Sequence, residues 1–190
     1  VCSSDLYMRK TLSVGVLGDE GSGKSTLISS LISESFQLNV RPVLPPVVVP
    51  PEMTADKVAV SIIDTSSAPR DRDSVFETAL SCDVLCLLYA MNDNTMFERL
   101  STYWLPELRA RRCNLPVVIV GTKADLMSLS DEDTRKFRAA LDPLMAKFSL
   151  VETSLASSAK SLLNVKEAFY YAEKSVMHPT APIYDTEIGR

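Results

Sequence analysis

Residues that bind transition metals are scarce in this chain, whose 190 residues include one histidine and four cysteines. Neither His178 nor Cys2, Cys82, Cys86 and Cys113 has the spacing of a zinc site. Positive charge is not in excess, since the net charge is −4, and no apolar run reaches the roughly 18 residues of a membrane span. We therefore expect no nucleic-acid partner and no membrane contact by this chain itself. We interpret Cys82 and Cys86 as buried thiols.

Glycine is also scarce, yet three of the six glycines fall in one short segment. Residues Gly18–Ser25 read GDEGSGKS and match the phosphate-binding pattern G-x-x-x-x-G-K-[ST]. An apolar run precedes the segment, and residues with helical spacing follow it. Glycines let backbone N–H groups converge on phosphate oxygens, and a helix N-terminus adds partial positive charge. The segment therefore predicts a nucleotide-binding loop between a strand and a helix.

Each polar residue of this loop has an expected role. Lys24 would reach the β- and γ-phosphates, and the hydroxyl of Ser25 would bind Mg²⁺. The predicted nucleotide contacts of the loop are Glu20, Gly21, Ser22, Gly23, Lys24, Ser25 and Thr26.

Apolar runs alternate with amphipathic stretches along the chain, which is typical of an α/β fold with a largely parallel sheet covered by helices on both faces. We predict strands at 12–17, 58–63, 83–89, 116–120 and 149–153, and helices at 24–34, 71–81, 95–112, 131–147 and 165–177. Residues 42–51 contain five prolines, which leaves room only for a short edge strand at 47–49. The alternative for this stretch is a stiff surface connection.

Further polar residues follow the predicted strands. Asp64 ends the second long strand and is the expected carboxylate partner of Mg²⁺. Thr122, Lys123 and Asp125 follow another strand, at the sheet edge where open α/β sheets bind ligands. A carboxylate there can accept hydrogen bonds from guanine N1–H and N2–H₂, and adenine has no such pair of donors. A backbone N–H in the later loop of Ser158, Ala159 and Lys160 can donate to guanine O6.

These motifs, in this order, resemble the small GTPase family over about residues 10–177. Within it the chain is most similar to the mitochondrial Rho (Miro) GTPases, through Leu44-Pro45-Pro46, the segment 62–67 and the segment 168–184. The resemblance implies a P-loop NTPase fold of the Ras-like G-domain type, with a mostly parallel six-stranded sheet. It also implies GTP or GDP with Mg²⁺ as ligands, and GTP hydrolysis.

The same resemblance implies a cellular setting. Miro proteins act on the cytosolic face of the mitochondrial outer membrane, in mitochondrial transport, distribution and morphology, through motor adaptors. In those proteins an EF-hand region follows the first GTPase domain. We accordingly expect residues 1–7 to be non-native or disordered, residues 8–177 to form the GTPase domain, and residues 178–190 to form an extended exit linker.

Departures from the family pattern concern catalysis. Where small GTPases carry Asp-x-x-Gly-Gln, this chain reads Asp64-Thr65-Ser66-Ser67-Ala68, so the water-orienting Gln is missing. Lys24, Ser66 and Ser67 remain as candidate catalytic residues, and we expect slow hydrolysis. The usual Mg²⁺-binding Thr is also missing, and we expect Val47 or Val48 in its place.

Two readings of the function remain open after this comparison. One is a slow GTPase switch, and the other is a hydrolysis-deficient GTP-binding scaffold that acts as an interaction module. An ATP-using enzyme is disfavoured by Asp125. Glu20 stands where the family usually has Gly, and its carboxylate either opposes the γ-phosphate or an incoming arginine, or points to solvent.

Overall fold

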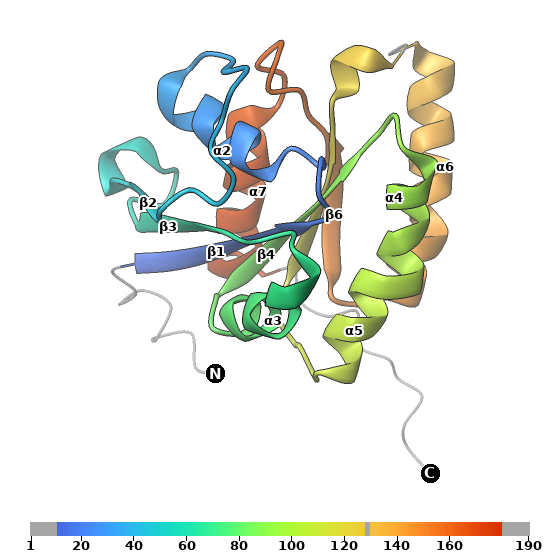
Figure 1. Ribbon diagram of the computed structural model, residues 1–190, viewed down its shortest axis with the longest axis horizontal. Coiled ribbons are helices and arrows are strands. Elements are labelled where there is room, and N and C mark those ends of the chain that lie inside the picture. The colour runs from blue at the N-terminus through green and yellow to red at the C-terminus, as the bar shows by residue number, and fades with distance from the viewer. Residues whose placement is uncertain (1–10, 128–129, 180–190) are drawn as a thin grey trace.

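A twisted sheet of six strands, in the order β2-β3-β1-β4-β5-β6, runs through the centre of the molecule (Figure 1). The computed structural model describes residues 11–127 and 130–179. Strand β2 pairs antiparallel with β3, and the other pairs are parallel. The strands are β1 (Thr11–Gly18), β2 (Val47–Val49), β3 (Ala59–Asp64), β4 (Val84–Ala90), β5 (Val117–Thr122) and β6 (Val151–Ala156). The predicted fold class is confirmed, and residues 47–49 are an edge strand.

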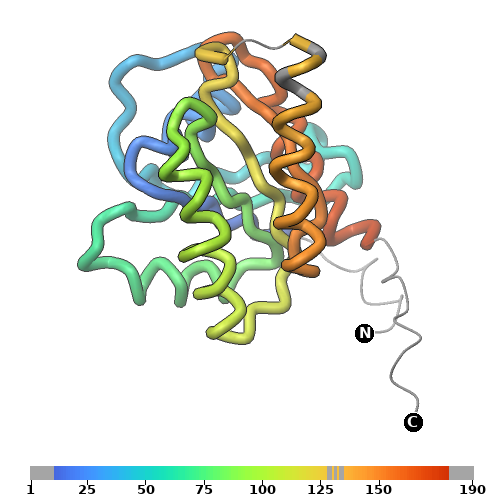
Figure 2. The backbone as a smooth tube through the Cα atoms, turned by 90° about the vertical axis from the view of Figure 1, so that its right-hand side faces the viewer, coloured from blue at the N-terminus to red at the C-terminus, as the bar shows by residue number. Residues whose placement is uncertain are grey.

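Helices cover both faces of this sheet. Two apolar clusters fill the space between the layers: α3, α5 and α6 contribute to one, and α2 and α7 contribute to the other. Figure 2 shows α4, α5 and α6 in front of the sheet. The helices are α2 (Lys24–Ser33), α3 (Arg72–Leu80), α4 (Asn94–Arg99), α5 (Leu105–Ala110), α6 (Asp131–Lys147) and α7 (Val165–Met177). Within the described residues no helix is long and apolar enough to cross a bilayer.

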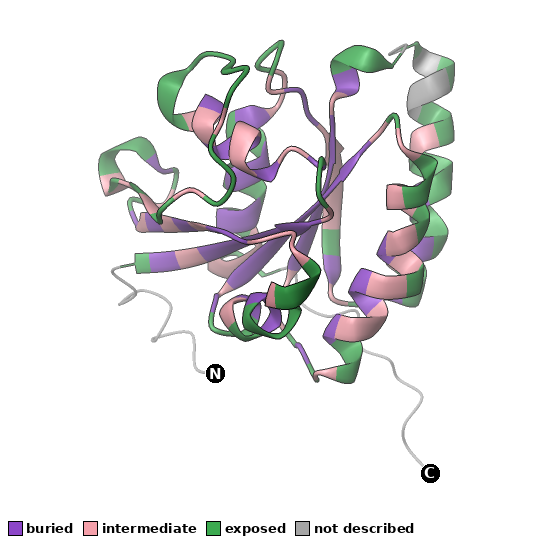
Figure 3. Cartoon of the chain, in the orientation of Figure 1, coloured by how far each residue is buried: buried purple, intermediate pink, exposed green. Residues whose placement is uncertain are grey.

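Strand β1 shows why the central strands read as continuous apolar runs. Leu12, Val14 and Val16 point to the cluster beneath α2 and α7, whereas Leu17 points to the opposite cluster. Both faces of the strand are therefore buried, as the colours of Figure 3 show for the central strands. Period-2 alternation between apolar and polar residues disappears when both faces are covered. Cys82 and Cys86 are buried free thiols, as predicted.

The predicted single helix at 95–112 is wrong in its middle. Residues Leu100–Trp104 form a π-helical turn between α4 and α5, in which the Leu105 N–H donates to the Leu100 carbonyl. Pro106 follows at the start of α5 and has no N–H to continue an α-helical ladder. A widened turn before a proline keeps the neighbouring N–H groups bonded. Trp104 nevertheless packs in the core.

The chain ends were predicted as separate segments. Helix α7 ends at Met177, and the His178 N–H donates to the Lys174 carbonyl at 2.8 Å. This end agrees with the helix predicted at 165–177, because Pro179 disfavours helical geometry at His178. The predicted segment 1–7, and the exit segment from residue 180 onward, lie outside the described residues.

Candidate nucleotide-binding site

The phosphate loop follows β1, at the point where the connections of the sheet change direction. Strand β1 lies between β3 and β4, and open α/β sheets bind ligands at such a switch point, outside the carboxyl ends of the strands. Gly18, Gly21 and Gly23 have φ values of 145°, 78° and 88°, which glycine adopts far more readily than other residues. A Cβ on Gly18 would lie 2.3 Å from the Leu88 carbonyl oxygen. Gly18 therefore lets the loop pass close to β4.

Lys24 begins helix α2 directly after the loop, and its side chain folds back across it. Its ammonium donates to the carbonyl oxygens of Gly18 at 2.9 Å and Asp19 at 3.2 Å, and also to Ser67 Oγ. Only 6% of the residue is exposed. Burial lowers the pKa of Lys24, against the opposing fields of Asp64, Asp19 and Glu20. The loop thus holds a cation at its centre, beside converging backbone groups.

A carboxylate and a hydroxyl meet beside this lysine. Ser25 Oγ donates to Asp64 Oδ2 at 2.5 Å, and the Leu44 N–H donates to the same oxygen at 2.9 Å. The second oxygen, Asp64 Oδ1, is buried and has no hydrogen-bond partner. A buried carboxylate oxygen without a partner is costly unless a ligand satisfies it. Ser25 and Asp64 therefore fit a Mg²⁺ ion, which prefers few protein ligands together with phosphate oxygens and water.

Within the described residues there is no cluster of three or more His, Cys, Asp or Glu side chains that could hold a metal ion by themselves.

The loop after β3 brings the candidate catalytic serines to the phosphate loop. Ser67 contacts Lys24, whereas Ser66 Oγ donates to Asp71 Oδ2 at 2.6 Å and accepts from the Ala68 N–H at 3.1 Å. Thr65 turns inward, and its hydroxyl donates to the Val16 carbonyl at 2.6 Å. Only Ser67 is therefore bonded to the predicted phosphate-binding machinery.

A cleft of about 760 Å³ opens above Lys24 and Ser25. Glu20 lies at its rim and is exposed. Val40, Pro42 and Val43 of the chain between α2 and β2 form another wall. The expectation that Val47 or Val48 would lie here is wrong, because both belong to β2, where they pair with β3 away from the cleft. An irregular connection rich in proline has no periodicity from which its path can be read.

A second, smaller cleft of about 270 Å³ lies beside the first and shares Gly23, Thr26 and Lys123 with it. The shared residues make the two clefts neighbours at the start of α2. Its walls include two predicted binding segments, and also an aromatic residue that the sequence analysis did not single out, Phe36. The lining residues are Gly23, Thr26, Leu27, Phe36, Gln37, Leu38, Thr122, Lys123, Asp125, Leu126, Ala159 and Lys160.

Asp125 is exposed at this smaller cleft, and its carboxylate is bonded to buried Ser158. Ser158 Oγ donates to Asp125 Oδ1 at 2.5 Å, and the Ser158 N–H donates to the Leu163 carbonyl at 2.9 Å. Thr122 Oγ1 donates to the Ser22 carbonyl at 2.6 Å, which joins the end of β5 to the phosphate loop. Ser158 is itself fully buried. Ser158 thus orients Asp125, while Ala159 and Lys160 line the cleft.

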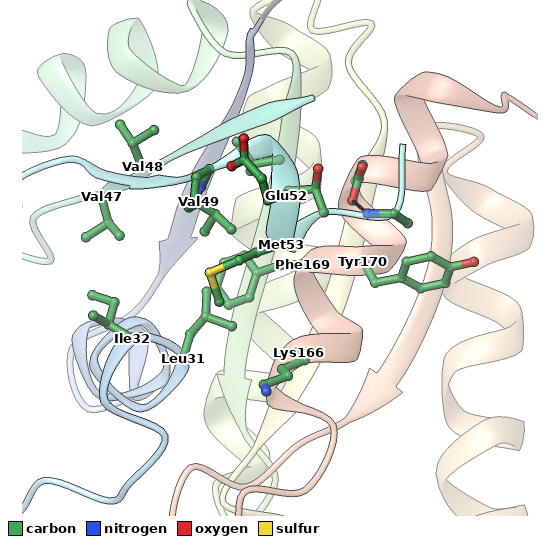
Figure 4. Close-up of a pocket in the computed structure, with 15 residues that line it drawn as sticks. Leu31, Ile32, Val47, Val48, Val49, Glu52, Met53, Lys166, Phe169 and Tyr170 are labelled. Carbon is green, nitrogen blue, oxygen red and sulfur yellow. Dashed lines mark hydrogen bonds between the residues drawn. The ribbon is translucent and has the colours of Figure 1, made fainter. Parts of the chain in front are cut away.

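A mainly apolar groove lies elsewhere, between α2, β2 and α7. Figure 4 shows Ile32, Val48 and Met53 around this groove of about 550 Å³, with Tyr170 at its edge. Its walls contain none of the predicted nucleotide contacts. The cleft above Lys24 and Ser25, at about 760 Å³, is larger than this groove, so cleft size indicates the same place as the glycine loop and the strand ends.

Comparison with known proteins agrees with this geometry. Residues 13–178 match the Ras family. The chain is 42% identical over 179 residues to a protein of Mycosarcoma maydis named mitochondrial Rho GTPase 1, a match that covers 94% of the chain and 24% of the relative. It is 41% identical over 178 residues to the protein of that name from Arabidopsis thaliana, covering 94% of the chain and 27% of the relative. The chain therefore spans about a quarter of the length of the curated relatives it matches.

Proposed function

This chain belongs to the Ras family of GTPases, and we propose that it is a guanine-nucleotide switch domain of the mitochondrial Rho type that hydrolyses GTP slowly. Binding of GTP or GDP and hydrolysis of GTP are the general properties of the family. The slow rate, the roles of individual residues and the cellular setting are the parts that we propose for this chain.

One observation carries the proposal: the cleft above Lys24 and the cleft in front of Asp125 share the residues at the start of α2. A nucleoside triphosphate has an anionic end and a base with donors and acceptors, joined by a sugar. Lys24 and the loop N–H groups suit the phosphates, and the Asp125 carboxylate suits the N1–H and N2–H₂ donors of guanine. Because the Ser158 N–H is already bonded to Leu163, we assign the contact with guanine O6 to the N–H of Ala159.

We assign Mg²⁺ to Ser25 and Asp64, because Asp64 Oδ1 is buried without a partner beside the Ser25 hydroxyl. When bound, the ion would offset negative charge on the phosphate oxygens. In this assignment Lys24 binds the β- and γ-phosphates from the place where the Gly18 and Asp19 carbonyls and Ser67 hold it.

The loop after β3 supports the proposal of slow hydrolysis. Ala68 has no polar side-chain atom to orient a water molecule, and Ser66 is bonded to Asp71. Of the two serines, Ser67 is the one that contacts Lys24, the residue assigned to the phosphates. An arginine from a partner can supply about 10³–10⁵-fold in related enzymes, and exposed Glu20 at the cleft rim would lie in its path. The alternative function, a GTP-binding scaffold without turnover, is the limiting case of the same geometry.

Base selection is tested by competition against a fluorescent guanine nucleotide. We expect GTP and GDP to displace the probe and ATP to fail. Asp125→Ala should weaken binding by several kcal/mol, the order of magnitude of lost charged hydrogen bonds. Asp142→Ala, which removes a carboxylate from α6 outside both clefts, is the control and should bind like the unaltered chain. Equal displacement by ATP and GTP would refute the assignment of guanine.

The family resemblance supports a broader proposal for the intact protein. We propose that residues 8–177 act as its GTPase domain on the cytosolic face of the mitochondrial outer membrane, and that they bind adaptors or motors of mitochondrial transport. Residues 178–190 would lead toward a following EF-hand region. Protease treatment of intact mitochondria from cells expressing the full-length protein tests the location. Loss of this domain to added protease is the expected result, and complete protection contradicts it.

A further inference from the structure

Asp19, the second residue of the phosphate loop, forms an ion pair with an arginine 80 residues further along the chain. Arg99 stands at the last position of α4, where its Nε donates to Asp19 Oδ2 at 2.9 Å and its Nη2 donates to Oδ1 at 3.0 Å. Both carboxylate oxygens are therefore engaged in a two-point contact, which fixes orientation as well as charge. The Asp19 side chain is 20% exposed and that of Arg99 is 38% exposed, so water only partly screens the pair.

The backbone of Asp19 supports the residues that face the phosphates. Its carbonyl oxygen accepts from the Lys24 ammonium at 3.2 Å and from the Ser22 N–H at 3.2 Å. The Asp19 carboxylate also acts on Lys24 through its charge, since it is one of the groups that raise the pKa of this lysine against the effect of burial. A shift of Asp19, or a loss of its counter-charge, would therefore be felt at Lys24.

An aromatic ring in turn supports Arg99. The Arg99 guanidinium carbon lies 4.5 Å from the centre of the Tyr103 ring, within the π-helical turn. The guanidinium of Arg72, at the start of α3, lies 4.9 Å from the centre of the same ring. Contacts of a guanidinium with an aromatic face are favourable and directional. The Tyr103 ring thus connects the phosphate loop, through Arg99, with α3, the helix after the loop of Ser66 and Ser67.

We propose that Arg99 is a positioning residue of the nucleotide site, which neutralises the Asp19 carboxylate and fixes the Asp19 carbonyl beneath Lys24. The inference rests on the proposed binding of guanine nucleotide. An unpaired carboxylate in the phosphate loop would repel a triphosphate more than a diphosphate, because the triphosphate carries more negative charge. Arg99 therefore sets the preference between the two nucleotides without touching either.

The test compares Arg99→Gln with Arg111→Gln. Arg111 is a matched control, because its Nη2 donates to Asp73 Oδ1 at 2.8 Å and its guanidinium lies 4.4 Å from the centre of the Phe76 ring. Its aspartate partner belongs to α3 and not to the phosphate loop. Dissociation constants are measured for GDP and for a non-hydrolysable GTP analogue. We expect Arg99→Gln to weaken binding of the analogue by roughly three- to tenfold and binding of GDP by less. Arg111→Gln should leave the ratio of the two dissociation constants unchanged.

A double variant distinguishes an effect of the unpaired Asp19 charge from a general loss of folding in Arg99→Gln. Adding Asp19→Asn to Arg99→Gln removes the unpaired charge, and we expect the ratio of the two dissociation constants to return toward that of the unaltered chain. The effect of Arg99→Gln alone should also shrink as salt is added. Equal ratios in Arg99→Gln and Arg111→Gln, or a double variant no better than the single one, would overturn this inference alone. If the unaltered chain bound neither nucleotide, the proposed function would fall together with it.

Discussion

Gly18 is the residue on which the path of the phosphate loop depends most directly. It combines a φ of 145° with a position where a Cβ would lie 2.3 Å from the Leu88 carbonyl oxygen and 2.8 Å from Ser22 Oγ. Gly21 also has a positive φ, of 78°, but a Cβ there would meet only Met96 Cε at 3.7 Å. The two glycines of one motif are thus required for different reasons.

Gly18→Ala should therefore destabilise the nucleotide-free chain by about 2–6 kcal/mol, from backbone strain together with steric overlap. Gly21→Ala is the control and should cost only the strain, about 1–3 kcal/mol. Urea unfolding without nucleotide measures both variants. Equal losses of stability in the two variants would show that contact with β4 does not shape the loop.

Lys24 predicts a dependence of stability on pH. Burial lowers its pKa in the folded chain below the ordinary value of 10.5, so between the two values the unfolded chain binds more protons. Below the folded pKa the buried charge is a constant cost, and this cost disappears as pH rises from the folded pKa to 10.5. The stability of the unaltered chain relative to Lys24→Met should therefore rise over that window. If the difference in unfolding free energy between the unaltered chain and Lys24→Met stayed constant up to pH 10.5, the pKa of Lys24 would not be lowered by burial.

At the scale of elements, we propose that the loop between β3 and α3 sets the rate of hydrolysis. It presents Ser67 to Lys24 and turns Ser66 toward Asp71, which leaves no side chain of the kind that orients water in related enzymes. The bond from Ser66 to Asp71, the residue directly before α3, ties the loop to the start of that helix. These contacts support the proposal that hydrolysis is slow.

A single-turnover assay tests this reading of the loop. We expect GTP bound to the isolated chain to persist for many minutes, and Ser67→Ala to change the rate little, because a serine bonded to the lysine does not position the nucleophile. Ser74→Ala on α3 is the control. Hydrolysis within seconds that is lost in Ser66→Ala or Ser67→Ala would mean that one of these hydroxyls does orient water.

The elements differ in how far the sequence predicts them. Helices α6 and α7 have the predicted bounds, since amphipathic periodicity and Pro179 define them. The π-helical turn before Pro106 was not predicted, because apolar spacing scarcely differs between an α-helix and one widened turn. Two cleft residues, Val43 and Phe36, were not predicted for another reason. Both lie in the irregular connection from α2 to β2, whose path depends on tertiary contacts such as Leu44 N–H to Asp64.

At the scale of the whole molecule, the sheet explains why distant motifs work together. The parallel strands β1, β3 and β5 end at one edge, which brings the phosphate loop and Asp125 to two adjoining clefts. The same edge places buried Asp64 against Ser25 of the loop. The positions of these motifs at strand ends were predictable, because apolar runs and glycines mark them. The contacts that hold them, Thr122 to Ser22 and Arg99 to Asp19, join residues too far apart in the chain for any local pattern to reveal.

The central claim is that the two clefts together bind one guanine nucleotide. The most direct measurement is to denature the purified chain, separate the released nucleotides by chromatography and quantify them against the protein. The account predicts a guanine nucleotide, GDP or GTP, approaching one per chain. Release of an adenine nucleotide instead, or an empty chain that takes up no added GDP in the presence of Mg²⁺, would contradict it.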